Sequence, residues 1–318
     1  MRAAILILIW LLIGEAASAE SYPTRPVEIV VPYGPGGTGD VIARQLAKKL
    51  GEHFGETFLV LNKPGAAGTL GAAIVARAPA DGYMLLLGYT SEIAIEPFLR
   101  PTTYDLKSFE PIAVAGVTPL LLIGQKNLGA GSMRDLVDII RSKPENFTYA
   151  SAGFGSPAHI AGELLKRDGK LAIRHIPYKG GADAVAAVLG GQVDIYFTGL
   201  PPAMSLVRNG NIKAFAITGE QRSRALPDVP TMHESGFANF NLSGWFALFA
   251  PKGTPQGVLD PLRAAVSSAL ADPTVQAVLN KNGVELRPDP TANVRQFVDA
   301  ESTMYRNLIT ELAIKADK

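Results

Sequence analysis

Three glycine-containing segments have the composition of anion-binding turns. Residues 34–39 read GPGGTG, residues 151–157 read SAGFGSP, and residues 178–181 read YKGG. Glycine lets the backbone turn sharply and leaves its N–H groups unobstructed. A helix that begins directly after such a turn points its first N–H groups at the same place. A carboxylate fits such a site as well as a phosphate does, so we treat the three segments as candidate binding loops for a small anion.

The first segment also fits the dinucleotide-binding pattern G-x-G-x-x-G, since it follows a predicted strand and opens a predicted helix. Two features argue against that interpretation. The second predicted strand ends at Asn62 and Lys63, where an acidic residue should bind the ribose, and Pro35 stiffens the turn. A tight turn without a ligand stays an alternative, in which Asp40 complements the helix dipole.

Nucleophilic catalysis is the second chemistry to weigh. The G-x-S-x-G pattern is absent, because in GFGS the serine, Ser156, stands one place late. Ser156 precedes Pro157, which favours a helix N-cap. An exported serine hydrolase that uses Ser156 or Ser151 stays an alternative. The four histidines have no metal-binding spacing and cysteine is absent, so we expect no catalytic residue, metal or cofactor.

The elements that position these loops follow from the hydrophobic pattern. Short apolar runs rich in β-branched residues alternate with segments of helical period, such as Ile42, Leu46 and Leu50. This alternation predicts an α/β fold with mostly parallel sheets covered by helices. The predicted strands are residues 27–32, 58–62, 84–88, 111–115, 120–124, 147–150, 172–176, 193–198, 213–218 and 246–250.

So many strands suit two sheets better than one. We expect one lobe at 20–117 plus 246–318 and a second at 118–245, with crossings near 114–122 and 245–251. Two crossing strands would make a hinge, and the cleft between the lobes would be the ligand site. Thr90 and Ser91 follow another predicted strand and could add hydrogen bonds.

The N-terminus predicts export. Met1 and Arg2 precede an apolar run at 3–13, and small residues stand at Ala17 and Ala19. This is typical of a secretory signal peptide cleaved after Ala19, with an uncleaved anchor as the alternative. The chain has 30 Lys and Arg residues against 29 Asp and Glu residues. It has neither the excess nor the stripe of basic residues that is typical of nucleic-acid-binding proteins.

Taken in order, these segments resemble the periplasmic solute receptors of the Bug type, which serve tripartite tricarboxylate transporters. The resemblance covers nearly the whole mature chain. The segments that carry it are 22–26 (YPTRP), 29–32 (IVVP), 36–40 (GGTGD), 62–68 (NKPGAAG), 81–83 (DGY), 149–156 (YASAGFGS) with His159, 178–181 (YKGG), 190–194 (GGQVD), 226–231 (LPDVPT), 245–246 (WF) and 249–251 (FAP).

The resemblance implies a two-lobed periplasmic-binding-protein fold, type II-like. It also implies a monomer that closes over a small carboxylate, di- or tricarboxylic or aromatic, and hands it to integral-membrane permease subunits. A periplasmic signalling receptor stays an alternative. Carried over by position, the implied ligand contacts are Tyr33, Gly37, Thr38, Gly39, Asp40, Thr90, Ser91, Ser151, Ser156, His159, Gly180 and Gly181.

One departure from the family bears on the ligand. Many relatives have Asp-Asn after the aromatic residue in the strand that follows GGQVD, whereas this chain has Phe197 and Thr198 after Tyr196. The change removes a possible partner for a ligand ammonium group. We therefore expect a carboxylate ligand without an amino group.

Overall fold

The structure is a computed structural model that describes residues 22–315 apart from 144–145, 179, 239 and 241. The predicted leader and its cleavage site lie outside the described residues. Within the part described, no helix combines the length and apolar character needed to span a membrane.

Nine strands of the described chain form one continuous sheet, whereas their number led us to expect two sheets. The strand order is β2-β1-β3-β9-β4-β7-β5-β6, with β8 also pairing with β4. The β1 strand runs parallel to β2 and β3, and β5 runs parallel to β6 and β7. The strands are β1 Val27–Val31, β2 Phe58–Asn62, β3 Met84–Tyr89, β4 Phe109–Gln125, β5 Thr148–Ser151, β6 Arg174–Pro177, β7 Ile195–Gly199, β8 Ile212–Ile217 and β9 Ser243–Pro251.

The long strand β4 joins the two parallel groups and differs from the prediction. The two strands expected at 111–115 and 120–124 are one strand of 17 residues. Its first part pairs with β9, and from Leu120 onwards it pairs with β7 and β8. The register with β9 shifts between Pro111 and Ala113 and between Val114 and Gly116. Such bulges bend a strand without ending it, so the glycine and prolines here do not separate two strands.

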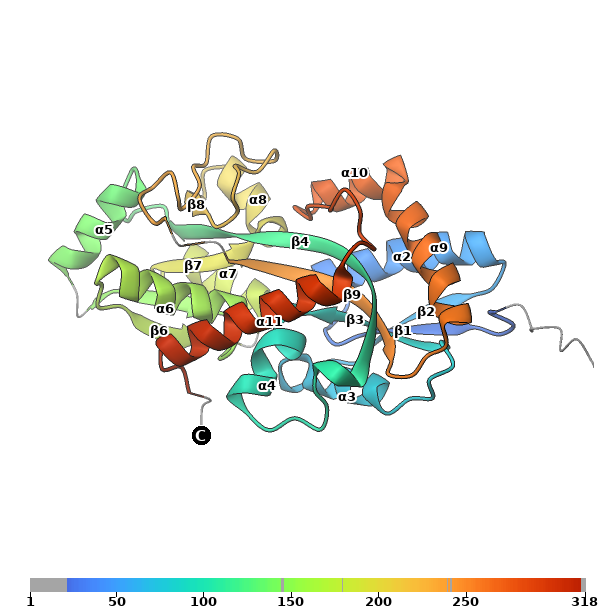
Figure 1. The fold of residues 1–318 in the computed structure, drawn as a ribbon. Helices are drawn as coiled ribbons and strands as arrows, with labels where there is room; N and C mark the ends of the chain where they lie inside the picture. The colour runs from blue at the N-terminus through green and yellow to red at the C-terminus, as the bar shows by residue number, and fades with distance from the viewer. Residues whose placement is uncertain (1–21, 144–145, 179, 239, 241, 316–318) are drawn as a thin grey trace, which may run out of the picture.

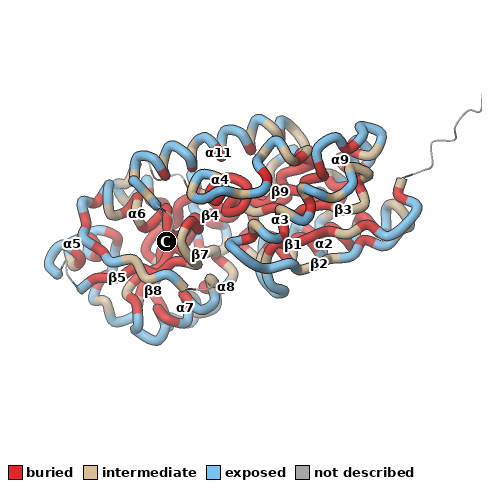
Figure 2. The backbone as a smooth tube through the Cα atoms, turned by 90° about the horizontal axis from the view of Figure 1, so that it is seen from below, coloured by how far each residue is buried: buried red, intermediate tan, exposed pale blue. Residues whose placement is uncertain are grey.

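Helices cover both faces of the sheet, as the alternating pattern predicts (Figure 1). Ile42, Leu46 and Leu50 face the core and are fully buried, which confirms the helical stripe predicted there. Figure 2 shows the sheet strands largely buried and the outer helix faces exposed. The helices are α2 Thr38–Phe54, α3 Thr69–Ala76, α4 Glu96–Leu99, α5 Met133–Ser142, α6 Pro157–Gly169, α7 Gly181–Leu189, α8 Leu200–Arg208, α9 Gln256–Ala271, α10 Pro273–Lys281 and α11 Val294–Glu311, with short helical turns η1 Ala66–Gly68, η2 Ser91–Ile95 and η3 Leu106–Ser108.

The last helix, α11, runs along both halves of the molecule (Figure 1). Near its start, Arg295 donates hydrogen bonds to the carbonyl oxygens of Leu106 and Phe109. At its end, Glu311 pairs with Arg167 of α6 at 2.9 Å. The C-terminal helix therefore contacts elements of both halves of the molecule.

Candidate functional site

All three candidate loops follow the carboxyl end of a parallel strand. Residues 34–37 lead from β1 into α2, and residues 152–156 lead from β5 into α6. The third loop lies between the end of β6 at Pro177 and the start of α7 at Gly181. In open α/β sheets, ligands bind outside the carboxyl ends of the strands. One loop belongs to the first parallel group and two to the second, so a ligand that touches all three would bridge both groups.

The first loop is organised by Asp40. Its carboxylate accepts hydrogen bonds from the backbone N–H of Gly36 (3.1 Å), from Arg44 (2.8 and 3.0 Å) and from the amide of Asn62 (3.1 Å). Burial pushes the pKa of Asp40 upwards, but these hydrogen bonds outweigh that effect and leave the pKa lowered. The carboxylate is thus already in use, and a ligand contact of Asp40 would have to use its backbone N–H.

The start of α2 leaves backbone donors available. Gly37 is its N-cap and no side chain caps this helix end. The first in-helix bond runs from the N–H of Val41 to the carbonyl of Gly37, so the N–H groups of Thr38, Gly39 and Asp40 have no acceptor in the preceding turn. The backbone at Gly39 also lies close to the Phe246 ring, because a Cβ at this position would be 3.0 Å from that ring.

Half-buried Tyr33 and fully buried Glu92 form a pair beside this loop. The Tyr33 hydroxyl donates to one carboxylate oxygen of Glu92 at 2.7 Å, and the N–H of Tyr89 donates to the other at 2.6 Å. Burial raises the pKa of Glu92 to about 8. The Tyr33 ring meets Tyr89 edge-on, and Tyr89 stacks on Phe246 at 4.6 Å between centroids. Tyr33 therefore offers mainly its ring to a ligand.

Thr90 and Ser91 have different partners. The Thr90 hydroxyl accepts from the N–H of Trp245 at 2.7 Å and contacts its carbonyl at 3.2 Å, which ties β3 to β9. The Ser91 hydroxyl donates to the carbonyl of Gly155 at 3.4 Å and so links the first parallel group to the loop after β5. Gly155 has φ +72°, and a Cβ there would lie 2.5 Å from Leu99 of α4. The two groups are thus in direct contact at Gly155.

The second loop is held by its own hydroxyl groups. Ser156 caps α6, since its hydroxyl accepts from the N–H of His159, which confirms the predicted N-cap. The hydroxyls of Ser151 and Ser156 lie 2.9 and 2.8 Å from the carbonyl of Gly153, and the N–H of Gly153 donates to Ser151. Both predicted serines are therefore engaged within the loop.

Two stacked histidines lie under the same loop. His159 accepts the N–H of Gly155 at its Nδ1 (3.2 Å), and Nε2 of His175 contacts the Ser151 hydroxyl at 2.7 Å. The two rings stack at 4.2 Å between centroids. Burial lowers the pKa of His159 to about 4 and that of His175 to about 3. Sequence spacing did not single out His175, because only the pairing of β5 with β6 brings it to Ser151.

The third loop resembles the first. Gly180 is the N-cap of α7 and no side chain caps this helix. A Cβ at Gly181 would lie 3.2 Å from the Tyr196 hydroxyl of β7. The buried Thr198 hydroxyl, on the same strand, has no hydrogen-bond partner among the described residues. The starts of α2 and α7 therefore both offer first-turn N–H groups, whereas Ser156 closes the start of α6.

Ser151 and His175 differ from an exposed nucleophile beside its base. Ser151 is fully buried, and its hydroxyl lies 2.9 Å from the carbonyl oxygen of Gly153 and 2.7 Å from Nε2 of His175. Within the part of the chain described, no three His, Cys, Asp or Glu side chains are grouped to hold a metal ion.

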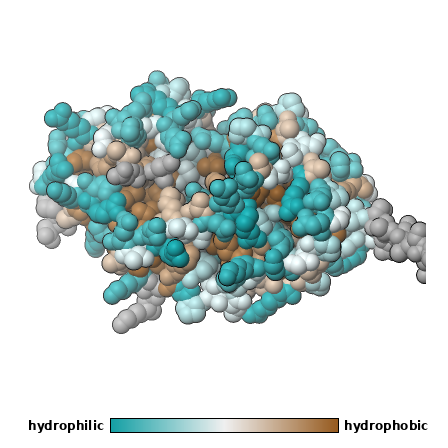
Figure 3. All heavy atoms as spheres, viewed as in Figure 1, coloured by the Kyte–Doolittle hydropathy of each residue, from teal (hydrophilic) through white to brown (hydrophobic). Residues whose placement is uncertain are grey.

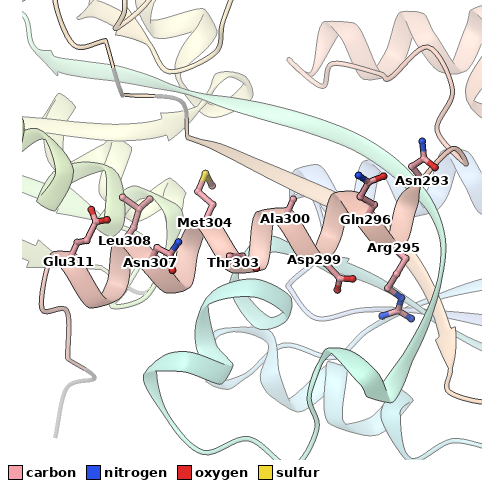
Figure 4. A pocket seen from close by; sticks show the side chains of 10 residues that line it. All are labelled: Asn293, Arg295, Gln296, Asp299, Ala300, Thr303, Met304, Asn307, Leu308 and Glu311. Carbon is pink, nitrogen blue, oxygen red and sulfur yellow. The ribbon is translucent and has the colours of Figure 1, made fainter.

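Two other hollows lie away from these loops. One, of about 1020 Å³, follows the exposed side of α11 (Figure 4). The other, of about 860 Å³, lies beside the antiparallel pair β4 and β9 and is lined by Trp245, Glu301 and Arg224, among others. In Figure 3 hydrophilic and hydrophobic residues are mixed over the face that carries α11. Neither hollow contains a predicted site residue.

Comparisons with known proteins agree with this geometry. The family model TctC, described as tripartite tricarboxylate transporter family receptor, matches residues 42–314. The protein BugT of Bordetella pertussis is 35% identical over 309 residues, which cover 95% of this chain and 94% of BugT. Two solved structures are similar as well. The R. palustris protein Rpa4515 with adipate has a TM-score of 0.86 and 32% identity over 92% of this chain and 99% of that one.

MatC from Rhodopseudomonas palustris with bound malate has a TM-score of 0.81 and 32% identity, and the match covers 91% of this chain and all of MatC. The strand order and the pairing of β4 with β9 agree with these matches, which extend along nearly the whole chain. The chain belongs to the receptor family of the tripartite tricarboxylate transporters and has its two-lobed fold.

Proposed function

We propose that this receptor captures a small carboxylate between its lobes in the periplasm and delivers it to membrane permease subunits. The observation that carries the proposal is that α2 and α7, which follow strands of different parallel groups, both begin at a glycine without a side-chain cap. Such helix starts favour a negative group. The relatives crystallised with adipate and malate support a carboxylate as that group.

The proposed ligand contacts are of two kinds. Donors would come from the backbone of Thr38, Gly39 and Asp40 in one lobe and from Gly181 in the other. Ring or hydroxyl contacts would come from Tyr33, Thr90 and Ser91. The remaining predicted residues would support the loops that carry the donors, and these are Gly37, Ser151, Ser156, His159 and Gly180.

The lobes are proposed to be residues 20–117 plus 246–318 and residues 118–245. The change of β4 from pairing with β9 to pairing with β7 and β8 near Leu120 supports a boundary there. A ligand that contacts both lobes only when they are closed shifts the population towards the closed state, because its affinity differs between the two. A few charge-assisted hydrogen bonds, each about 1.5–3 kcal/mol, would support micromolar binding.

Periplasmic delivery requires export, which we assign to a signal peptide cleaved after Ala19 on the evidence of its sequence. N-terminal sequencing of the mature protein from the periplasmic fraction tests this assignment. A protein that begins at Glu20 agrees with it, and one that retains Met1 in the membrane fraction contradicts it.

Calorimetric titration of the mature protein tests the ligand class. Adipate, malate, succinate, aspartate and an aromatic acid such as benzoate would be compared. We expect micromolar binding of at least one acid that lacks an amino group, and a preference for aspartate would contradict the expected absence of an ammonium partner. Failure of every acid would contradict the proposed function.

Two further measurements separate this function from its alternatives. A fluorophosphonate probe should leave Ser151 and Ser156 unlabelled, and stoichiometric labelling of either would favour a hydrolase. Deletion of the gene should abolish growth on the acid that binds. Normal uptake with loss of induction would favour a signalling receptor instead.

A further inference from the structure

A column of rings lies beneath the loop after β5. Tyr149 stacks on His175 at 4.8 Å, and His175 stacks on His159 at 4.2 Å. Phe154 of the loop meets both imidazoles edge-on, at 4.9 and 5.2 Å. Its rings come from β5, β6 and α6, which all belong to the second lobe. The loop after β5 packs against this column.

Each histidine of the column has one ring nitrogen bonded to the loop. His159 accepts the N–H of Gly155 at Nδ1, so that nitrogen carries no proton. Nε2 of His175 hydrogen-bonds to the Ser151 hydroxyl, which also contacts the carbonyl oxygen of Gly153. Burial lowers the pKa of both rings, which favours their neutral form.

The loop held in this way makes the contact with the first lobe. Its Gly155 carbonyl accepts from Ser91, and a Cβ on Gly155 would lie within 2.7 Å of both Leu99 and Glu96 of α4. If His159 were protonated at Nδ1, it would lose its bond to the Gly155 N–H and would place a positive charge 4.2 Å from the stacked ring of His175.

We propose that His159 and His175 act as a pair of positioning residues, which as neutral rings hold the 151–156 loop in the shape that contact between the lobes requires. They brace the loop without touching the ligand. The link from loop shape to ligand affinity rests on the proposed function, whereas the brace itself does not.

The charged groups around the column act on the histidines in opposite directions. Glu163 of α6 accepts from the Tyr149 hydroxyl at 2.6 Å and pairs with Lys166 at 2.8 Å. Glu96 of α4 pairs with Arg100 at 2.7 Å. Burial is the largest effect and lowers the pKa of both rings. Glu163 opposes it at His159, whereas Lys166 lowers the pKa of both rings further.

The test uses variants of the mature protein that distinguish the loss of the hydrogen-bond acceptor from the loss of the imidazole ring. In His159→Asn the amide oxygen can take the place of Nδ1 and does not titrate, whereas His159→Leu keeps bulk and removes the acceptor. In His175→Gln the amide can still donate to Ser151. Hydrogen exchange of the peptide that contains Gly155 is measured without ligand, and the affinity for adipate is measured separately.

At pH 7 we expect His159→Leu to lower the protection factor of the Gly155 amide at least tenfold and His159→Asn to retain it. Between pH 7 and pH 4 the wild type should lose protection, whereas His159→Asn should not. Unchanged protection in His159→Leu, or a His159→Asn variant that behaves like His159→Leu, would overturn the proposal.

If His159→Leu does not fold, the comparison of wild type with His159→Asn between pH 7 and pH 4 still tests the proposal. Equal loss of protection in these two proteins would overturn it. His175→Gln should keep the protection of the wild type at pH 7, and its loss there would likewise count against the brace. If no variant or wild type binds adipate or another acid, the proposed function fails while the exchange data still report on the brace.

Discussion

At the scale of single residues, Gly155 has both a backbone conformation that favours glycine and a close contact with the other lobe. Its φ of +72° strains any side chain, and a Cβ would collide with Leu99 and Glu96. We expect Gly155→Ala to weaken binding of the ligand at least tenfold, because the loop can no longer approach α4. Calorimetry of the variant measures this effect.

Gly210 provides the matched control. It has φ +66° but nothing lies within 4 Å of its Cβ position, and it follows α8 far along the chain from the loops. Gly210→Ala should cost about 1 kcal/mol of stability from the strained backbone and leave affinity unchanged. If both variants bind like the wild type, Gly155 has no part in closure.

Glu92 gives a prediction on pH. Burial raises its pKa in the folded state to about 8, above its value in the unfolded chain, so the folded state holds this proton more tightly. The stability that the group contributes is complete at acid pH and is lost as the pH rises towards 8, at up to about 1.4 kcal/mol per pH unit. Glu92→Gln should flatten the pH dependence of the unfolding free energy between pH 5 and 8, as measured by urea titrations. A wild-type slope retained in the variant would show that another group causes it.

At the scale of elements, Ser156 tests whether a serine in the site acts as a cap or as a nucleophile. Ser156 caps α6 and Ser132 caps α5 through the same kind of hydrogen bond. Each Ser→Ala change should cost about 1 kcal/mol in urea unfolding. Only Ser156→Ala should also weaken ligand binding, because only α6 lies behind the loop. Equal affinities of the two variants would limit Ser156 to a structural role.

The elements also show what hydrophobic pattern can predict. Strand positions and helical stripes such as that of Ile42, Leu46 and Leu50 follow from local periodicity. Local periodicity does not predict that β4 is one strand rather than two, because its bulges depend on the pairing with β9. Likewise His175 reaches Ser151 through the pairing of β6 with β5. Contacts made by tertiary pairing leave no mark in the spacing of one sequence.

The candidate site divides in the same way. Glycine content and strand ends predicted all three loops, and Ser156 beside Pro157 predicted a cap. Asn62, Tyr33 and Trp245 bond to Asp40, Glu92 and Thr90, respectively. These partners could not be predicted, because they come from distant parts of the chain. The sequence therefore indicated which turns precede a helix, but only packing decides which polar groups of these turns already have hydrogen-bond partners.

At the scale of the whole molecule, the proposed function requires the lobes to close around the ligand. A ligand that binds only the folded state at one hundred times its Kd stabilises that state by about 2.7 kcal/mol. If an acid such as adipate binds, saturation should raise the melting temperature and reduce the radius of gyration measured by small-angle X-ray scattering. The reduction is expected because the acid, in the proposed binding mode, would bridge α2 in one lobe and α7 in the other.

Hexane-1,6-diol is the matched control ligand, since it has the same number of carbon atoms as adipate and no carboxylate. It should change neither the melting temperature nor the radius of gyration at equal concentration. Stabilisation by the acid with no change in the radius would mean that the lobes are already closed in the absence of ligand. The contact of Ser91 with Gly155 would then hold the closed state without the ligand, and binding would have to proceed through a minor open population.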